Sequence, residues 1–511
     1  MTARAACASK TGVRGRGETG RRCRLKIGFL RSAGSSPAVR TTLLCPLAVI
    51  AACGQRADTG PVVVSAIGQP PTLDLKRGGT PSRLLVDATA QGLVRFDAAG
   101  HIEPGLAERW IVLDDGASYI FRLREAYWAD GRRVTAREVV RLIGRRFTAR
   151  DNPLAPFFTA IDRAVVMTPQ VIEVRLRRPR PDLLKLLAQP EMALRRDDVG
   201  AGPMRIVETG AAPLLRPAPD PSRTDPDDGR GPQPEDDVRL IGERAALAIL
   251  RFDRGRSDLV SGGGFAEWPL LATADVPRGA ARIDPAAGLF GLAVVRREGF
   301  LADAENRAAV SQVIDRAALT AAVLPQWTPA NRLLPEALDS AAEPRTPTWV
   351  PLTLEERRAA ARARVAAWTE GPVRLRIALP AGPGATLVWG QLAASLAAIG
   401  IGAERVAIDA PADLRLVDAV APYDSARWYM ATACRPCSEE ADTAIEAARD
   451  ASTLDERARR IAEADAALDA DVAFIPLARP LRWSLVSDRL TAWQPNARAW
   501  HPLNRLRAAT N

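Results

Sequence analysis

Stretches with the pattern of β-strands alternate with stretches that have the pattern of α-helices along most of this chain of 511 residues. The β-branched run over 61–67 is typical of a buried strand, and segments 118–124 and 170–179 alternate apolar and polar side chains as half-buried strands do. An amphipathic helix is predicted to begin at Thr135. Such alternation favours an α/β architecture.

The second half of the chain repeats this alternation. Its expected elements, in order, are a strand over 373–380, a helix over 385–400 that Gly400 closes, a strand over 403–409, a helix over 455–471 and a strand over 472–478. Between the two halves, residues 212–238 are rich in Pro, Asp and Gly, which predicts a long surface loop or insertion.

Near the start of the chain, a largely apolar run extends from Leu43 to Cys53. It is too short for a membrane-spanning helix, which needs roughly 20 apolar residues, and it suits the apolar part of a secretory signal, which has about 7–15. Arg40 precedes the run, and its last four residues, IAAC, resemble the bacterial lipobox. That resemblance implies cleavage before Cys53 and a diacylglycerol on the Cys53 sulfur. An uncleaved anchor and cleavage elsewhere stay open as alternatives.

The basic residues of the chain are concentrated before this point. Residues 1–52 hold ten Lys or Arg and one Glu, so 60 basic and 59 acidic side chains remain in the other 459 residues. The net charge of +10 is therefore mostly lost with the leader, and we exclude a nucleic-acid partner. We interpret residues 1–38, which fit no part of a signal, as a start-site error with Val39 as the start. The length that remains predicts two or three domains.

Cys434 and Cys437 form the motif CRPC, and the other cysteines lie at or before position 53. In an oxidising compartment this pair is expected to form a local disulfide. Because a helical pattern follows the pair directly, a thioredoxin-like redox site is kept as an alternative. Two cysteines without a histidine nearby do not complete a zinc site, and no metal or cofactor is predicted.

Other kinds of chemistry have little support in the sequence. The chain has two histidines, His101 and His501, so a Ser-His or Cys-His pair has few places to form. The segment 382–387, GPGATL, is a partial dinucleotide fingerprint in which Leu387 replaces the third glycine. A hydrolase with a carboxylate pair stays a minor alternative, since the acidic residues carry no distinguishing spacing.

Residues 92–147 carry a specific succession of motifs. They are Pro104-Gly105-Leu106-Ala107 with Trp110, the strand 119–124, Trp128 with Asp130-Gly131, and Thr135-Ala136 at the start of a helix. This succession resembles the opening of the family 5 solute-binding proteins of bacterial ABC transporters, the group of oligopeptide, dipeptide and nickel binders. Further segments follow in the order of that family, at 200–206, 300–319, 331–338, 392–401 and 472–481. The resemblance extends over roughly residues 61–490.

The resemblance implies a two-lobe α/β fold of the periplasmic-binding-protein type II, with an extra subdomain, around a hinge and a ligand cleft. The implied parts are a leader over 1–52, a first lobe from 61–90, 200–285 and 478–511, the extra subdomain over 91–199 and a second lobe over 286–477. The implied function is that of a periplasmic, lipid-anchored monomer without enzymatic activity, which captures a peptide or peptide-like ligand and delivers it to an ABC permease and its ATPase subunits. The lipid would keep the binder close to its permease.

The candidates for the ligand cleft are Phe265, Trp268, Arg427, Trp428 and Tyr429. Filling of the core or of the lobe interface is an equally good interpretation of the aromatic ones. Two other functions stay open: a sensor or chaperone-like lipoprotein without a permease, and a thiol-redox protein that uses the CRPC pair.

Peptide-binding members of the family commonly have an acidic residue shortly after a Gly-Trp, which pairs with the α-ammonium of the ligand. With Trp428 in the Trp position, Ala431 or Thr432 stands where that acid is expected. Burying an ammonium without a counter-charge is costly. We therefore expect either that Glu439 or Glu440 substitutes, or that the ligand is less polar or differently charged.

Overall fold

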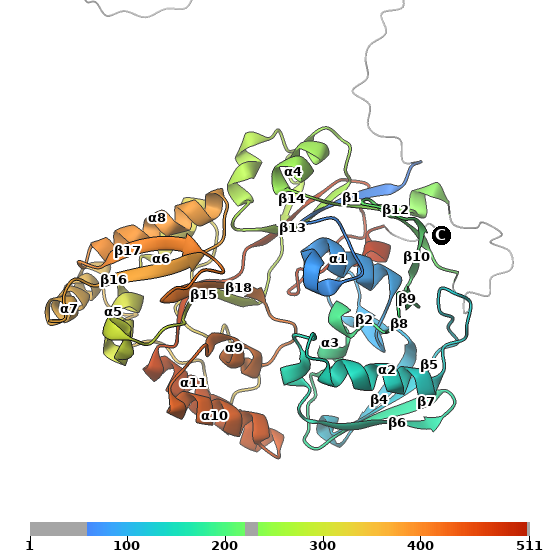
Figure 1. Cartoon of the computed structure of the whole chain (residues 1–511), viewed down its shortest axis with the longest axis horizontal. Coiled ribbons are helices and arrows are strands. Elements are labelled where there is room, and N and C mark those ends of the chain that lie inside the picture. The colour runs from blue at the N-terminus through green and yellow to red at the C-terminus, as the bar shows by residue number, and fades with distance from the viewer. Residues whose placement is uncertain (1–58, 220–232, 508–511) are drawn as a thin grey trace, which may run out of the picture. The chain divides into compact units, whose positions relative to one another are not determined.

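The structure is a computed structural model that describes residues 59–219 and 233–507, so Cys53 and the predicted signal segment lie outside it. Within the described part, the strands form sheets of seven, five and four strands and two short two-stranded ribbons (Figure 1). Helices pack on these sheets, and the predicted α/β class is confirmed.

The seven-stranded sheet is built around β1, in which the β-branched residues Val62, Val63 and Val64 are buried. Its strands, in sheet order, are β10 (Met204–Glu208), β11 (Leu214–Pro217), β12 (Val238–Glu243), β1 (Val62–Ile67), β13 (Leu259–Gly264), β20 (Arg482–Val486) and β14 (Ala281–Ile283). β1 pairs in parallel with β12 and β13, and β20 returns from the far end of the sequence to pair antiparallel with β13. The helices α1 (Leu75–Thr89) and α4 (Ala245–Asp253) pack against this sheet.

Strand β11 corrects the prediction of a loop over 212–238. Leu214 and Leu215 are buried, and this segment pairs antiparallel with β10 on one side and β12 on the other. The Pro/Asp-rich composition concealed the strand, because two consecutive leucines anchor a segment of only four residues.

The five-stranded sheet is formed by the second half of the chain. Its strands, in sheet order, are β17 (Gly402–Ala407), β16 (Arg374–Leu379), β18 (Leu414–Val420), β15 (Gly288–Val294) and β19 (Phe474–Ala478). The parallel strands β16 and β17 are joined by α8 (Pro383–Ala397), and Gly400 turns the chain after this helix with a φ of 86°. The helices α5 (Ala304–Val313), α6 (Arg316–Val323) and α7 (Leu354–Ala366) belong to the same half (Figure 1).

The four-stranded antiparallel sheet has the order β4 (Ala107–Leu113), β5 (Ser118–Leu123), β7 (Val171–Leu176) and β6 (Ile161–Thr168). The helix α2 (Ala136–Thr148) packs on it through Val139 and Ile143 (Figure 1). The predicted start of this helix is confirmed, because the Thr135 side chain accepts a hydrogen bond from the backbone N–H of Glu138. The remaining elements of this part are β2 (Val94–Phe96), β3 (Ile102–Pro104), α3 (Leu183–Leu187), β8 (Arg195–Arg196) and β9 (Val199–Gly200).

Three helices connect β18 to β19: α9 (Ala426–Ala433), α10 (Glu439–Asp450) and α11 (Leu454–Asp471). α10 and α11 pack side by side (Figure 1). This helical group meets the part that carries the four-stranded sheet, since the side-chain amide of Gln189 donates a hydrogen bond of 2.7 Å to the carbonyl oxygen of Pro422. Short 3-10 helices lie at Asp114–Gly116, Ala155–Phe157, Pro190–Met192, Pro234–Asp236, Trp268–Thr273, Gly299–Ala302 and Leu503–Arg505.

The expected ranges of the two lobes and of the extra subdomain stay predictions. Whether each range folds as a separate unit stays a prediction. In the ranges that the structure describes, no helix combines the length and the apolar character needed to cross a membrane.

Candidate ligand-binding site

A small cavity of about 10 Å³ lies where the segment 157–186 faces the segment 423–457. It has room for about one water molecule. Its walls are formed by Phe157, Ala160, Ile161, Leu176, Arg180, Asp182, Leu183, Leu186, Tyr423, Arg427 and Arg457. Residues that are more than 230 positions apart in the sequence thus enclose one space, and three of them are arginines.

Secondary structure positions each charged side chain. Arg427 is the second residue of α9, and Arg457 lies in the first turns of α11, where it faces inward and is 3% exposed. Arg180 follows β7, and Asp182 directly precedes the short helix α3. The buried leucines of α3 fix this helix against the core and so hold Asp182 at the cavity.

Arg457 is held by a carboxylate from a distant loop. Its Nη2 donates hydrogen bonds of 2.7 Å to Asp339 Oδ2 and to Ser425 Oγ. Asp339 also accepts hydrogen bonds of 2.8 Å from the Ser425 hydroxyl and from the backbone N–H of Ala426. Burial alone would lower the pKa of Arg457, but the charges of Asp339 and Asp182 outweigh it and raise that pKa. Asp339 therefore already has its full set of donors.

Among the residues that the structure describes, the hydrogen-bond acceptors of Arg427 and Arg180 are neutral. Arg427 Nη2 donates a hydrogen bond of 2.9 Å to the carbonyl oxygen of Pro156, and the Arg427 guanidinium lies 5.3 Å from the centre of the Phe157 ring. Arg180 Nη2 donates a hydrogen bond of 2.6 Å to the carbonyl oxygen of Arg449. Burial lowers the pKa of Arg427. Burial first, and then the nearby charges of Arg457 and Arg427, lower the pKa of Arg180 to about 9.

Two donors of these arginines lack an acceptor. Arg427 Nε and Arg457 Nη1 are buried and have no hydrogen-bond partner within the described part of the chain. A buried donor left in this state costs about 1–3 kcal/mol, and more when it carries charge. The carboxyl group in the cavity wall is that of Asp182, whose pKa is raised by burial. The arrangement can therefore accept an electronegative group.

Of the five residues predicted for the cleft, Arg427 is the one that lines this cavity. Trp428 and Tyr429, its neighbours on α9, are 6% and 1% exposed and pack edge to face, with ring centres 5.0 Å apart. They belong to the hydrophobic core. Their participation in ligand binding stays a prediction.

Phe265 and Trp268 follow β13 and lie elsewhere in the fold. Phe265 is 2% exposed and packs against Phe290 and Trp327 in the core of the five-stranded half, with ring centres 4.8 Å and 6.0 Å away. Trp268 is half-buried and meets Trp483 edge to face at 6.1 Å. The structure thus places both in packing positions, and a role in binding stays a prediction for them too.

The sequence pattern did not indicate the other polar members of the cavity wall, namely Arg180, Asp182, Tyr423 and Arg457. Arg457 is one of three arginines in the segment DERARR, and only its burial sets it apart from Arg459 and Arg460, which are exposed. The single signal was the helical period, which places Arg457 on the same face as Ile461, Ala464 and Leu468.

The expectation that Glu439 or Glu440 substitutes for the acid missing near Trp428 stays a prediction. Asp424, just before α9, forms ion pairs with Lys185 of α3 and with Arg498. Glu439 and Glu440, named as substitutes, are exposed in the first turn of α10.

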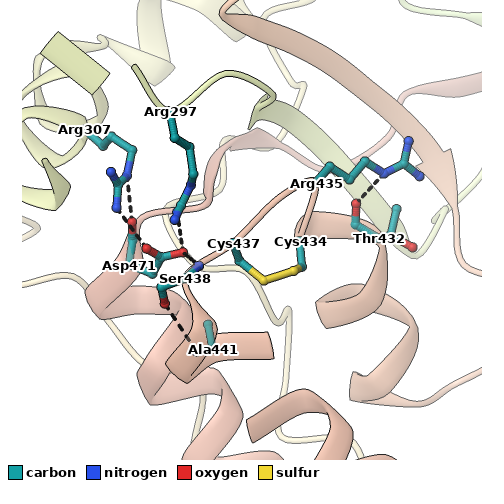
Figure 2. The surroundings of a disulfide bond; sticks show 9 residues. All are labelled: Arg297, Arg307, Thr432, Cys434, Arg435, Cys437, Ser438, Ala441 and Asp471. Carbon is teal, nitrogen blue, oxygen red and sulfur yellow. Dashed lines mark hydrogen bonds and ion pairs between the residues drawn. A yellow bond between two sulfur atoms is a disulfide. The ribbon is translucent and has the colours of Figure 1, made fainter. Parts of the chain in front are cut away.

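Cys434 and Cys437 form a disulfide in the turn between α9 and α10 (Figure 2). The pair follows a helix and not the strand that a thioredoxin-like site requires. Asp442 lies close enough to the two sulfurs to complete a three-ligand cluster, but sulfurs joined in a disulfide offer no thiolate to a metal. Nearby, Asp471 accepts hydrogen bonds from Arg307, Arg297 and the backbone N–H of Ser438, which caps α10 (Figure 2).

A larger cavity of about 280 Å³ lies within the five-stranded half, among α5, α11 and the segment before α7. All of its wall comes from residues 304–476. It therefore does not lie between the two parts that enclose the arginine-lined cavity.

Comparisons with known proteins find a family match in the middle of the chain. Residues 101–212 match the model of the bacterial extracellular solute-binding proteins, family 5. A probable deoxycholate-binding periplasmic protein of Escherichia coli is 30% identical over 146 residues, which are 24% of this chain and 27% of that protein. The chain thus matches about a quarter of the length of this relative.

The fold is shared over a much larger part of the chain. The structural match to the murein tripeptide-binding protein MppA of Escherichia coli includes 89% of this chain and 99% of the MppA chain, with a TM-score of 0.74 and 18% identity. OppA of Haemophilus influenzae, in complex with the peptide RPPGFSPFR, covers 88% and 99%, with a TM-score of 0.70 and 16% identity. NikA of Brucella suis, in complex with Fe(III)-EDTA, covers 88% and 99%, with a TM-score of 0.68 and 18% identity. The predicted two-lobe binding-protein fold is confirmed.

Proposed function

We propose that this chain, whose residues 101–212 match the extracellular solute-binding proteins of family 5 and whose fold is similar to those of OppA and MppA, captures a small solute outside the cytoplasm and delivers it to an ABC permease. It performs no bond chemistry in this role, and the energy of transport comes from the ATPase subunits of the permease. A lipid on Cys53 holds the monomer near the membrane and so raises its effective concentration at the permease.

One observation carries this proposal beyond the family. The cavity that holds Arg180, Arg427 and Arg457 is closed by two parts of the chain that are far apart in sequence. Polar groups that converge in a small buried space between separate parts of a fold are typical of a ligand site that closes around its solute.

We propose a peptide or peptide-like molecule as the solute. The neighbouring proteins MppA and OppA are named for, or crystallised with, peptides. Deoxycholate, named in the E. coli relative, is the first alternative to test, because that relative aligns at 30% identity. Asp424 is the candidate partner for a peptide ammonium, which would have to displace Lys185 or Arg498 from it.

The proposal is tested by native mass spectrometry on the chain that begins at Gly54, purified gently enough to retain a bound molecule. The described residues after Gly54 belong to one compact unit, so this form is expected to fold. We expect a co-purified molecule that is released on denaturation and that restores the mass shift when it is added back. The proposal would be contradicted if the protein is empty when purified and neither peptides nor deoxycholate protect it against thermal unfolding.

Two other functions remain to be separated from this one. A permease and an ATPase encoded beside the gene favour delivery over a sensor or chaperone-like lipoprotein. A thiol-redox protein is separated by Cys437→Ser: the transport proposal expects ligand binding to persist in this variant, whereas a redox role expects thiol-disulfide exchange activity in the parent and its loss in the variant.

A further inference from the structure

The arginine-lined cavity contains an unmatched set of donors. Arg427 is 7% and Arg457 3% exposed, and each directs one N–H group, Nε and Nη1 respectively, to no acceptor among the residues that the structure describes. Both line the same cavity. Buried polar groups in folded proteins nearly always have partners, and an ion or ligand commonly supplies the missing one.

The charges at this point do not balance. Three guanidinium groups face the cavity, from Arg180, Arg427 and Arg457, and the one carboxyl group in its wall is that of Asp182. Asp339, which pairs with Arg457, is not part of the cavity wall. Its carboxylate oxygens already accept hydrogen bonds from Ser425 and Ala426 as well. A negative charge in the cavity would therefore be attracted by the Arg427 guanidinium, which forms no ion pair with another described residue.

Apart from the three arginines, Asp182 and Tyr423, the wall is apolar. Phe157, Ile161, Leu176, Leu183 and Leu186 surround the arginines, and the ring of Phe157 lies against the Arg427 guanidinium. Charged hydrogen bonds are stronger in such a desolvated site than at a surface. A guanidinium also matches the two oxygens of a carboxylate in plane and in spacing.

We propose that this cavity holds the anionic group of the captured solute, a carboxylate or a group of the same charge and shape, against Arg427 and Arg457. The inference rests on the proposed function and specifies its ligand class. The present volume of about 10 Å³ is smaller than a carboxylate, so the α3 side and the α9–α11 side separate to admit the group and close on it. The solute's own anion and a free inorganic anion share this chemistry, and the test distinguishes them.

The test measures binding to the full chain in its exported form by isothermal titration. The probes are butanoate, octanoate, benzoate and the tripeptide Ala-Ala-Ala, each beside its primary amide, together with sodium phosphate and sodium chloride. We expect at least one acid to bind about tenfold or more tightly than its amide. We further expect Arg427→Gln to lose this preference, while Arg459→Gln, which removes an exposed arginine of the same helical group, keeps it.

Each other outcome has a definite meaning. Acids and amides that bind equally well overturn the inference and leave the proposed function standing. Phosphate or chloride that binds alone, and is lost in Arg427→Gln, identifies a free inorganic anion as the occupant and overturns the assignment to the solute. Binding of none of these probes below about 10 mM, together with an uncharged co-purified ligand, overturns the inference only. No binding and no co-purified ligand overturn the proposed function as well.

Discussion

At the scale of single residues, Asp471, at the end of α11, is a buried charge with several partners. Its carboxylate accepts a hydrogen bond of 2.8 Å from Arg307 Nη2 and one of 2.9 Å from the backbone N–H of Ser438 (Figure 2). It also accepts a hydrogen bond from Arg297. Arg307 is 3% exposed and donates further hydrogen bonds to backbone carbonyls. One aspartate therefore joins α5, α10 and α11.

We predict that Asp471→Asn lowers the free energy of unfolding by about 3–5 kcal/mol, because it leaves the charge of Arg307 buried without a counter-charge. Urea unfolding of the variant and the parent measures this difference. The matched control is Asp488→Asn, at an exposed position, for which we expect a change within about 0.5 kcal/mol. Equal stability of Asp471→Asn and the control would contradict the proposed role of Asp471.

At the scale of elements, α8 offers two glycines in very different surroundings. A Cβ at Gly384, in the first turn, would lie 1.9 Å from the carbonyl oxygen of Phe265, whereas a Cβ at Gly390 would meet nothing within 4 Å. Gly384 thus allows the start of α8 to touch the segment that follows β13.

We predict opposite effects of alanine at these two positions. Gly384→Ala forces the backbone at Phe265 to move and is expected to lower the unfolding free energy by about 1–3 kcal/mol. Gly390→Ala reduces the backbone freedom of the unfolded chain and is expected to raise the unfolding free energy by about 0.5–1 kcal/mol. Thermal unfolding of both variants under one set of conditions compares them. A stabilising Gly384→Ala would show that this contact can relax without cost.

The disulfide between α9 and α10 closes a loop with a sequence separation of three residues. A loop of this length restricts the unfolded chain by roughly 2 kcal/mol. We predict that Cys434→Ser combined with Cys437→Ser lowers the unfolding free energy by that amount, and that a reductant has the same effect on the parent and none on the double variant. Urea unfolding with and without reductant measures both. Equal stability with and without the bond would contradict this structural role.

The elements were predicted better than their edges or their partners. The run over 61–67, the helix at Thr135 and the alternation over 118–124 gave the right element types, because apolar periodicity reports burial directly. The strand at Leu214 was missed, because its short apolar core lies inside a Pro/Asp-rich segment that otherwise has the composition of a loop.

At the scale of the whole molecule, the fold was predicted almost completely and the candidate site only in part. The order of the family-like motifs indicates the topology of the fold. The cavity, however, forms where residues near 180 contact residues near 427 and 457. A local sequence pattern does not predict such a contact between distant segments. Arg427 was named and Arg180 and Arg457 were not, because an arginine that turns inward and one that faces solvent look alike in sequence.

The same convergence makes the central claim directly measurable. If a solute is held between the two parts of the chain, both must lose backbone mobility together when it binds. Hydrogen–deuterium exchange of the purified protein, with and without the molecule recovered from it, reports this for every segment. We predict increased protection in 155–187 and in 421–460 at once. Protection confined to 304–311 and 345–349, around the larger cavity, or to one of the two parts alone, would contradict the account.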